Sequence, residues 1–171
     1  DIIRQTQGGV MRKNLLSIAD LSLDHIWEII ENAAERYGDY TTQLQGKSIA
    51  LLFEKASLRT RVSFDLAIHQ LGGHPITLLP QEVGLGVREP VADVAKVLSR
   101  FVDGIIARVN THTTLEIMSE NSSVPIINAL SDVEHPCQTL ADLATIYQKT
   151  ERLRGLTVAF VGDGNNVSNS L

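Results

Sequence analysis

The feature that most constrains the fold is an alternation of short apolar runs with stretches of helical spacing. The apolar runs have the length of strands that are buried on both faces of a sheet. They lie at residues 49–53, 76–79, 104–107, 125–127 and 157–161. Helical spacing or helix-start residues mark residues 22–38, 60–71, 90–101, 114–120 and 136–149, and glycines mark a loop at 81–89. This order predicts an α/β fold, a parallel β-sheet with helices on both faces.

Size, charge and cysteine content narrow the class of protein. A chain of 171 residues with 43% apolar and 20% charged residues is long enough for one ordinary domain and is not dominated by disorder. Its net charge of −5 argues against a nucleic-acid-binding surface. No apolar run is long enough for a membrane span. The single cysteine, Cys137, cannot form an internal disulfide, so we expect a reducing compartment, the cytoplasm.

The two ends of the chain differ from its middle. The first methionine is Met11, so residues 1–10 are interpreted as an upstream extension or a cloning remnant that lies outside the fold. The last predicted strand, at 157–161, has no helix after it to cover its face. We therefore expect this chain to be the front part of a longer protein.

Hydrogen-bond donors gather directly after the first predicted strand. The segment 55–61 contains Lys55, Ser57, Arg59, Thr60 and Arg61, and Thr60 is the expected cap of the helix that follows. Free backbone N–H groups at a helix start, hydroxyls and a guanidinium together form a cradle for phosphate. The glycines of a P-loop are absent, so ATP-type binding is poorly supported. The alternative is a capped helix whose charged side chains face water.

Further polar residues follow the third and fourth predicted strands. Arg108 ends the third strand, and His135 precedes Pro136, which is expected to begin a helix with Gln138 on its first turn. In a parallel sheet these positions meet at the carboxyl edge, where ligands bind. The alternatives are a surface ion pair for Arg108 and a capping or hydrogen-bonded loop histidine for His135. Cys137 is interpreted as a small buried hydrophobe, because no zinc set or catalytic triad accompanies it.

The chemistry of this set is that of hydrogen-bond donors and cations. The predicted crevice collects Ser57, Arg59, Thr60, Arg108, His135 and Gln138. Neither a pair of carboxylates nor metal-ligand spacing accompanies them. Such a site holds a small dianion and polarises a carbonyl oxygen, without a metal or a covalent nucleophile.

Two of these segments resemble the signatures of a known family. The pattern F-x-K-x-S-x-R-T-R at 53–61 and the pattern H-P-x-Q-x-L-A-D at 135–142 resemble those of the aspartate/ornithine carbamoyltransferases. The cysteine at 137 and the Gly-Asp-Gly-Asn-Asn run at 162–166 are more similar to the ornithine branch. The resemblance implies a carbamoyl-phosphate-binding domain at 11–150. Residues 151–171 would be the first strand and turn of a Rossmann-like ornithine-binding domain.

The resemblance also implies an activity and roles for single residues. A carbamoyl group would pass from carbamoyl phosphate to the δ-amine of L-ornithine, giving L-citrulline and phosphate in arginine biosynthesis or catabolism, without a cofactor or metal. Ser57, Arg59, Thr60 and the backbone of Leu58 would hold phosphate. Arg108 and His135 would be the catalytic residues at the carbonyl oxygen. The remaining implied roles are amide binding for Gln138, ornithine binding for Asn166 and ion pairing behind the loop for Arg61.

Members of this family are trimers or multiples of trimers, built through the first domain. The loop corresponding to 81–89 reaches a neighbour's active site in these assemblies. The sequence departs from the family at Leu58, where Thr is usual, and at Gly84, where Gln or His is usual. Arg88 is the candidate to replace the missing side chain at 84.

Two alternatives to transfer onto ornithine stay open at this point. The acceptor could be another amine, such as putrescine or an acylated ornithine, because the amine-selecting residues are expected beyond Leu171. These residues by themselves could instead form a non-catalytic module that binds carbamoyl phosphate and trimerises.

Overall fold

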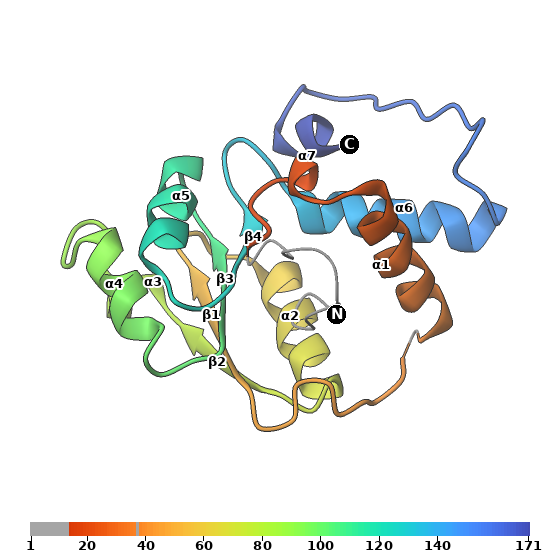
Figure 1. The fold of residues 1–171 in the computed structure, drawn as a ribbon. Coiled ribbons are helices and arrows are strands. Elements are labelled where there is room, and N and C mark those ends of the chain that lie inside the picture. Colours follow the sequence, from red (N-terminus) through yellow and green to blue (C-terminus); the bar gives the residue numbers. More distant parts are fainter. Residues whose placement is uncertain (1–13, 37) are drawn as a thin grey trace.

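The centre of the molecule is a parallel sheet of four strands in the order β2-β1-β3-β4. A computed structural model describes residues 14–36 and 38–171 (Figure 1). The predicted extension at 1–10 therefore lies outside the described residues. The strands are β1 (Ser48–Phe53), β2 (His74–Leu78), β3 (Gly104–Arg108) and β4 (Ile126–Leu130).

Helices cover both faces of this sheet, which confirms the predicted α/β class. In Figure 1, α2 lies on one face and α4 and α5 lie on the other. Helix α6 packs on β4 and on α1. The helices are the 3-10 helix η1 (Ile18–Asp20), α1 (Leu23–Glu35), α2 (Leu58–Gln70), α3 (Pro80–Val83), α4 (Val91–Leu98), α5 (His112–Asn121), α6 (Pro136–Thr150) and α7 (Asn166–Ser170). Within the described ranges, none of them is long and apolar enough to cross a membrane.

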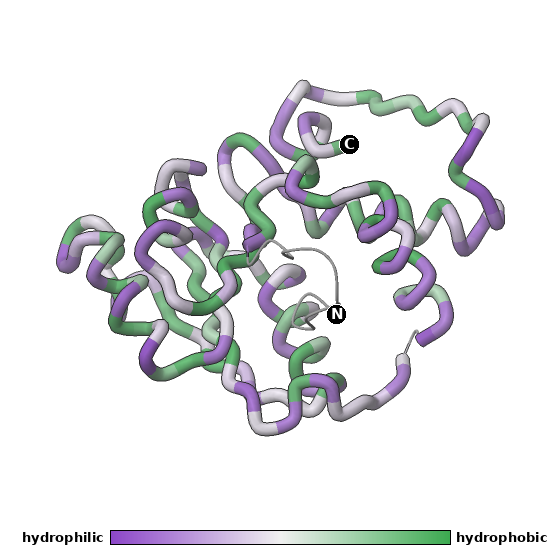
Figure 2. The backbone as a smooth tube through the Cα atoms, in the orientation of Figure 1, coloured by the Kyte–Doolittle hydropathy of each residue, from purple (hydrophilic) through white to green (hydrophobic). Residues whose placement is uncertain are grey.

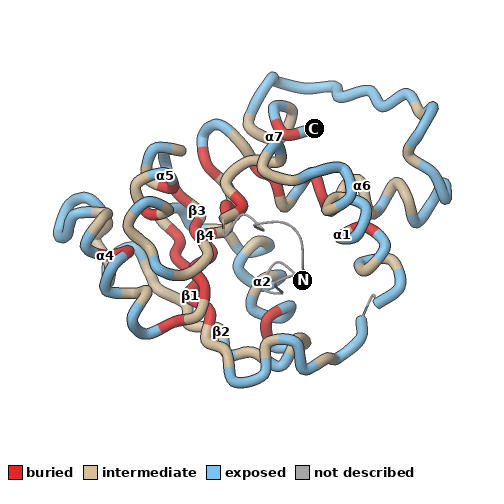
Figure 3. The backbone as a smooth tube through the Cα atoms, viewed as in Figure 1, coloured by how far each residue is buried: buried red, intermediate tan, exposed pale blue. Residues whose placement is uncertain are grey.

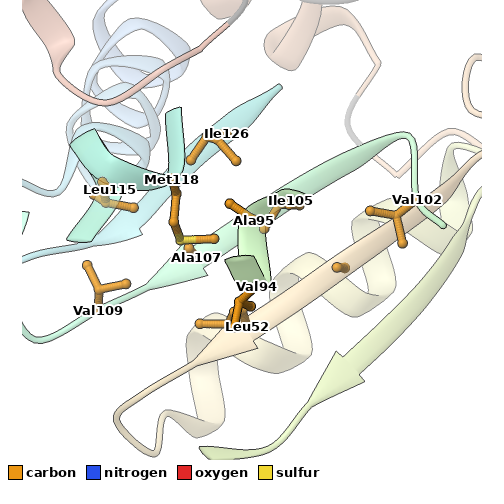
Figure 4. Close-up of a cluster of buried hydrophobic side chains, with 11 residues drawn as sticks. Leu52, Val94, Ala95, Val102, Ile105, Ala107, Val109, Leu115, Met118 and Ile126 are labelled. Atoms are coloured by element: carbon orange, nitrogen blue, oxygen red, sulfur yellow. The ribbon is translucent and has the colours of Figure 1, made fainter. Parts of the chain in front are cut away.

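The two cores follow from the alternation of side chains along the strands. In β1, Leu51 and its neighbours two residues away pack with Ile68 of α2. Leu52 faces the opposite way and lies beside Val94 of α4, in a cluster that also contains Met118 of α5 (Figure 4). Strands β1 and β3 are accordingly the most continuously buried part of the chain in Figure 3, whereas β2 at the edge of the sheet is only partly buried. Burial on both faces explains why β1 is apolar from Ile49 to Phe53, after the polar Ser48 at its start.

The strand order reverses between β1 and β3. The chain leaves β1 to form β2 on one side, then returns past β1 to form β3 and β4 on the other. In open α/β sheets ligands bind where the strand order reverses, and the place between the carboxyl ends of β1 and β3 is called the crevice below. The segment after Phe53 and the end of β3 at Arg108 flank this crevice.

The predicted fifth strand at 157–161 is not formed. In the described structure these residues have no regular secondary structure, although they are apolar (Figures 2 and 3). Val161 is 95% exposed and Val158 is 56% exposed. A strand requires a neighbour to accept and donate its backbone hydrogen bonds, and none lies beside this segment among the described residues. The assignment of 151–171 to a second domain stays a prediction.

The start of one helix differs from the prediction, and two short helices were not predicted. Helix α2 begins at Leu58, with Ser57 at the cap position, so Thr60 lies inside the first turn and is not the cap. The segment 81–89 was expected to be a loop, but its start belongs to α3. Helix α7 was not predicted, and the Asn165 side chain caps it by accepting from the N–H groups of Val167 and Ser168.

Candidate active site

The first turn of α2 presents donors that the helix itself does not use. The N–H groups of Leu58, Arg59 and Thr60 are the first three of the helix, where no preceding carbonyl can accept from them. Ser57 has extended backbone angles, and its side chain makes no capping hydrogen bond within the described residues. The side chain of Leu58 is 75% exposed, so replacing the usual Thr removes a hydroxyl but leaves the N–H in place. The turn is therefore a set of donors open to an anion.

Arg108 links this turn to the end of β3. Its Nη1 donates to Thr60 Oγ1 at 3.2 Å, and its backbone carbonyl accepts from the N–H of Glu54 at 2.8 Å. Its Nε is buried without a hydrogen-bond partner among the residues described. Burial lowers the pKa of the guanidinium, which nevertheless stays protonated at neutral pH. A charged group with an unused buried N–H therefore lies at the carboxyl end of β3, next to the first turn of α2.

His135 occupies the predicted position at the start of α6. It is the N-cap residue, Pro136 is the first helical residue, and the His135 backbone N–H donates to Ser170 Oγ at 2.9 Å. The side chain is 9% exposed, and its Nδ1 is buried with no partner in the described part of the chain. Burial and, to a smaller extent, the charge of Arg108 lower the pKa of His135, whereas Asp142 raises it. The imidazole is thus neutral at pH 7 and keeps one N–H to donate.

Gln138 and Asn166 are already engaged with the protein. Gln138 Nε2 donates to Asp142 Oδ1 at 2.9 Å on the exposed side of α6. Asn166 Nδ2 donates to the carbonyl of Ser131, in the turn that precedes His135. Asn166 is therefore joined to the edge of the site. Gln138 keeps a second N–H and its amide oxygen for a ligand, because the contact with Asp142 uses only one N–H.

The structure brings some of the predicted site residues into contact and leaves others apart. Thr60 and Arg108 are hydrogen-bonded, and His135 is close enough to Arg108 for its pKa to respond to that charge. Arg59 shares the first turn of α2 with Thr60, but its side chain is exposed and forms no hydrogen bond or ion pair among the described residues. Arg61 is also exposed, and the ion pair expected for it does not occur among the described residues.

Glu134 is a functional candidate that the sequence did not reveal. Its Oε1 accepts from Ser17 Oγ at 2.7 Å, and its Oε2 accepts from the N–H of Ile18 at 3.0 Å. Ser170 Oγ lies 3.3 Å from the same Oε2. The turn at 131–135, hereafter the β4–α6 turn, is thereby fastened to η1 and α7. Only a short Ser-x-x-Asp capping pattern at 17–20 marks this anchor in the sequence, and it does not indicate the partner.

Cys137 behaves as predicted for a small buried group. Its Sγ donates to the carbonyl of Asn128 at 3.4 Å, and burial raises the pKa of the thiol to about 12. The nucleophilic thiolate is therefore absent at neutral pH. No group of three or more His, Cys, Asp or Glu side chains that could hold a metal ion occurs in the described ranges.

A recess of about 210 Å³ lies beside these residues, at the carboxyl ends of β1 and β2. Its polar lining comes from Glu54 and Asn110, neither of which the sequence singled out. Glu54 Oε2 accepts from the N–H of Asn110 at 2.7 Å and so ties the loop after β1 to the loop after β3. The other lining residues are Leu52, Phe53, Leu78, Leu79, Pro80, Val83, Gly84, Leu85 and Val87.

Gly84 ends α3 in a left-handed conformation, with φ of 56°. A Cβ atom at this position would lie 2.6 Å from the Cβ of Arg88, which is closer than carbon atoms approach. The N–H of Arg88 donates to the Gly84 carbonyl at 2.7 Å and closes the turn. The departure at 84 is thus built into the backbone of this loop, because any side chain there meets residue 88.

Comparisons with known proteins agree on one family. Residues 13–148 match the family described as aspartate/ornithine carbamoyltransferase, carbamoyl-P binding domain. The ornithine carbamoyltransferase of Methanococcus maripaludis is 52% identical over 162 residues, and that of Methanocaldococcus jannaschii is 50% identical over 166 residues. Each alignment covers 92% of this chain and 53% of the relative. The chain thus spans about half the length of the curated relatives it matches.

Solved structures give the same result. The ornithine carbamoyltransferase of Thermus thermophilus superposes with a TM-score of 0.88 at 47% identity, covering 94% of this chain and 57% of the other. That of Pyrococcus furiosus also gives a TM-score of 0.88, at 45% identity, covering 92% of this chain and 52% of the other.

The environment of His135 predicts its titration. In the full-length protein we expect a pKa below the ordinary 6.5, because burial and Arg108 both disfavour the imidazolium. Inorganic phosphate should raise this pKa, since an anion offsets the charge of Arg108. Because the folded pKa is the lower one, the associated stability is present above pH 6.5 and is lost as the pH falls through the folded value.

NMR titration of the histidine rings measures this directly, with His135→Gln to assign the resonance. Arg108→Gln is the matched variant, and removal of its charge should raise the midpoint. A midpoint at or above 6.5 in the phosphate-free protein would contradict the buried environment described above.

Proposed function

The chain belongs to the aspartate/ornithine carbamoyltransferase family, and we propose that the full-length protein carries a carbamoyl group from carbamoyl phosphate to the δ-amine of L-ornithine. The products are L-citrulline and phosphate. The observation that carries this proposal is the pairing of Arg108 with His135 at the carboxyl edge, each with a buried nitrogen that has no partner in the described residues. Two such donors beside a helix start suit a carbonyl compound that bears a phosphate.

The phosphate group binds at the first turn of α2. Three backbone N–H groups and the Ser57 hydroxyl converge there, and Thr60 Oγ1 is held by Arg108 at 3.2 Å. Arg59 supplies a mobile guanidinium that closes over the phosphate from the solvent side. As the C–O bond to phosphate breaks, the leaving group takes the bonding electrons and its added charge stays in this cradle.

The carbonyl oxygen of the carbamoyl group lies between Arg108 and His135. The neutral δ-amine attacks the carbamoyl carbon, an N–C bond forms, and negative charge develops on the carbonyl oxygen. Arg108 and the ring N–H of His135 stabilise this oxyanion, and the departing phosphate takes up the amine proton as the tetrahedral species collapses. A histidine held neutral by burial can donate without carrying a charge of its own beside Arg108.

The carbamoyl amide and the acceptor amine need partners of their own. Gln138 accepts from the carbamoyl NH₂ through its amide oxygen, which the contact between its Nε2 and Asp142 leaves available. Asn166 binds the main-chain groups of ornithine from its position on α7, next to the β4–α6 turn. Most of the acceleration then comes from placement of the two substrates and from fixed charge.

The acceptor amine is tested by product analysis. The full-length protein, given carbamoyl phosphate, should form citrulline from L-ornithine and should form little product from putrescine or N-acetylornithine. This expectation is supported by the relatives named ornithine carbamoyltransferase, which share 47–52% of the aligned residues with this chain. Amino-acid analysis of the products measures it. Faster carbamoylation of either other amine would replace ornithine as the substrate, and no product from any of the three would favour a non-catalytic binding module.

Arg59 tests the phosphate cradle. Arg59→Ala should weaken binding of carbamoyl phosphate by about 1.5–3 kcal/mol, which is roughly a 10-fold to 150-fold rise in Kd, because a charge-assisted hydrogen bond is lost. Isothermal titration calorimetry of the full-length protein measures the change. Arg61→Ala is the matched control, since it removes the same charge from another face of α2 and should leave Kd within about twofold. Equal losses in both variants would indicate a general charge effect without a cradle.

We also propose that the protein assembles as a homotrimer or a multiple of trimers through this domain. Leu58, Val62 and Leu66 form an apolar stripe along α2 and are 75%, 50% and 48% exposed, which supports coverage by another chain. The loop 81–89 would reach a neighbour's site, with Arg88 in place of the side chain that Gly84 lacks. A cytoplasmic location and a role in arginine metabolism complete the proposal, supported by the single cysteine and by the proposed substrates.

Sedimentation equilibrium tests the assembly. At micromolar concentration the full-length protein should have the mass of a trimer or its multiple. The double variant Val62→Glu, Leu66→Glu should dissociate, because two carboxylates would be buried without partners. Ser63→Glu adds a charge to the same helix beside the stripe and should leave the mass unchanged. A monomeric parent protein would be incompatible with the proposed assembly.

A further inference from the structure

A second hydrogen-bonded cluster lies next to the proposed catalytic pair. His112 is the first residue of α5, and its Nδ1 is 2.8 Å from Ser131 Oγ in the β4–α6 turn. Its backbone N–H donates to Asp132 Oδ1 at 2.7 Å. Ser131 is completely buried, so its hydroxyl cannot exchange these partners for water. Two contacts therefore join the start of α5 to the turn that carries His135.

The direction of the contact between His112 and Ser131 follows from counting donors. The N–H groups of Glu134 and Val133 point to Ser131 Oγ at 3.1 and 3.3 Å. A hydroxyl oxygen accepts two hydrogen bonds and donates one. Its proton is therefore available for His112 Nδ1, whose distance is shorter than the 3.4 Å to the Glu134 carbonyl. The donor count thus assigns His112 Nδ1 as the acceptor in this contact.

The contact joins the segment that follows Arg108 to the turn that carries His135. His112 begins α5 shortly after Arg108, and Ser131 begins the turn that ends at His135. Helix α5 is anchored in the core by Leu115 and Met118, both 0% exposed. The ring of His112 is therefore held by a rigid element, and the turn is fastened to that element.

We propose that His112 is a positioning residue, which through Ser131 fixes the β4–α6 turn and so sets the position of His135 relative to Arg108. This inference rests on the proposed function, because it assigns to His112 a part in placing one of the groups that stabilise the oxyanion. The ring itself contacts neither the substrates nor the reacting atoms. Its effect passes through the buried hydroxyl of Ser131.

Replacement of the ring has a defined consequence. In His112→Ala the Ser131 hydroxyl loses its acceptor, while the backbone contact to Asp132 is kept. The turn then relaxes and His135 shifts, so kcat should fall about 10-fold to 100-fold, as for other groups that orient a catalytic residue. KM for carbamoyl phosphate should change little, because the cradle on α2 is untouched. His112→Asn restores an acceptor near the place of Nδ1 and should recover most of the rate.

A double-mutant cycle separates positioning from general loss of structure. The full-length protein is measured as the parent, His112→Ala, His135→Ala and the double variant, with exposed Thr113→Ala on the same helix as the control. His112→Ala should lower kcat in the parent background and have almost no further effect beside His135→Ala. The same factor in both backgrounds would overturn the inference, as would a His112→Asn variant as slow as His112→Ala.

A second readout does not depend on the reaction. The ring resonances of His135 should shift in His112→Ala, and in Ser131→Ala as a second variant, but not in Thr113→Ala. Unshifted resonances in both of the first two variants would overturn the positioning role even if the enzyme makes citrulline. Should the parent protein carbamoylate no amine, the proposed function fails, whereas shifted resonances still support the contact between His112 and the turn.

Discussion

The carboxyl ends of four parallel strands have to meet at one edge of the sheet, and the candidate site depends on this constraint. Each crossover returns the chain to the same edge, so the loops after β1, β3 and β4 lie side by side although they are far apart in the sequence. Backbone groups then join neighbouring loops directly, as in the hydrogen bond from the Glu54 N–H to the Arg108 carbonyl. The sheet topology thus sets the positions of these loops, and the hydrogen-bond donors of the site are side chains and N–H groups on them.

The sequence predicts those features that one segment determines alone. The apolar runs of β1 and β3 identify buried strands, and the residue after a buried strand in an α/β chain lies at the ligand edge, which is how Arg108 and His135 could be selected. The prediction fails where the structure of one segment depends on a second segment that packs against it. The run at 157–161 is apolar enough for a strand, but its backbone finds no neighbour in the described structure. Both Ser57 and Thr60 are residue types that commonly cap a helix. The structure shows that Ser57 is at the cap position of α2.

Contacts between distant side chains are the part that sequence patterns do not contain. Glu134 meets Ser17 and Ile18 across most of the chain, and the ring of His112 meets Ser131 across the gap between two strands. Ser131 directly follows β4, but no sequence pattern indicates that His112 is its partner or that Glu134 contacts Ser17 and Ile18. Their effect comes from where the sheet places them, namely around a single short turn. The contacts that support the site could therefore be found only in the structure, whereas several of its hydrogen-bond donors could be predicted from the sequence.

The turn at Gly84 restricts how this loop can change during evolution. A side chain at 84 is blocked by the Cβ atom of residue 88, and a left-handed φ adds strain for any residue other than glycine. Shortening Arg88 to Ala does not open the position, because alanine keeps the obstructing atom. A polar side chain at 84 together with any side chain at 88 thus requires a loop conformation different from the one in this structure. A single substitution at 84 therefore strains the loop unless the backbone around residue 88 also changes, so the effect of each position depends on the other.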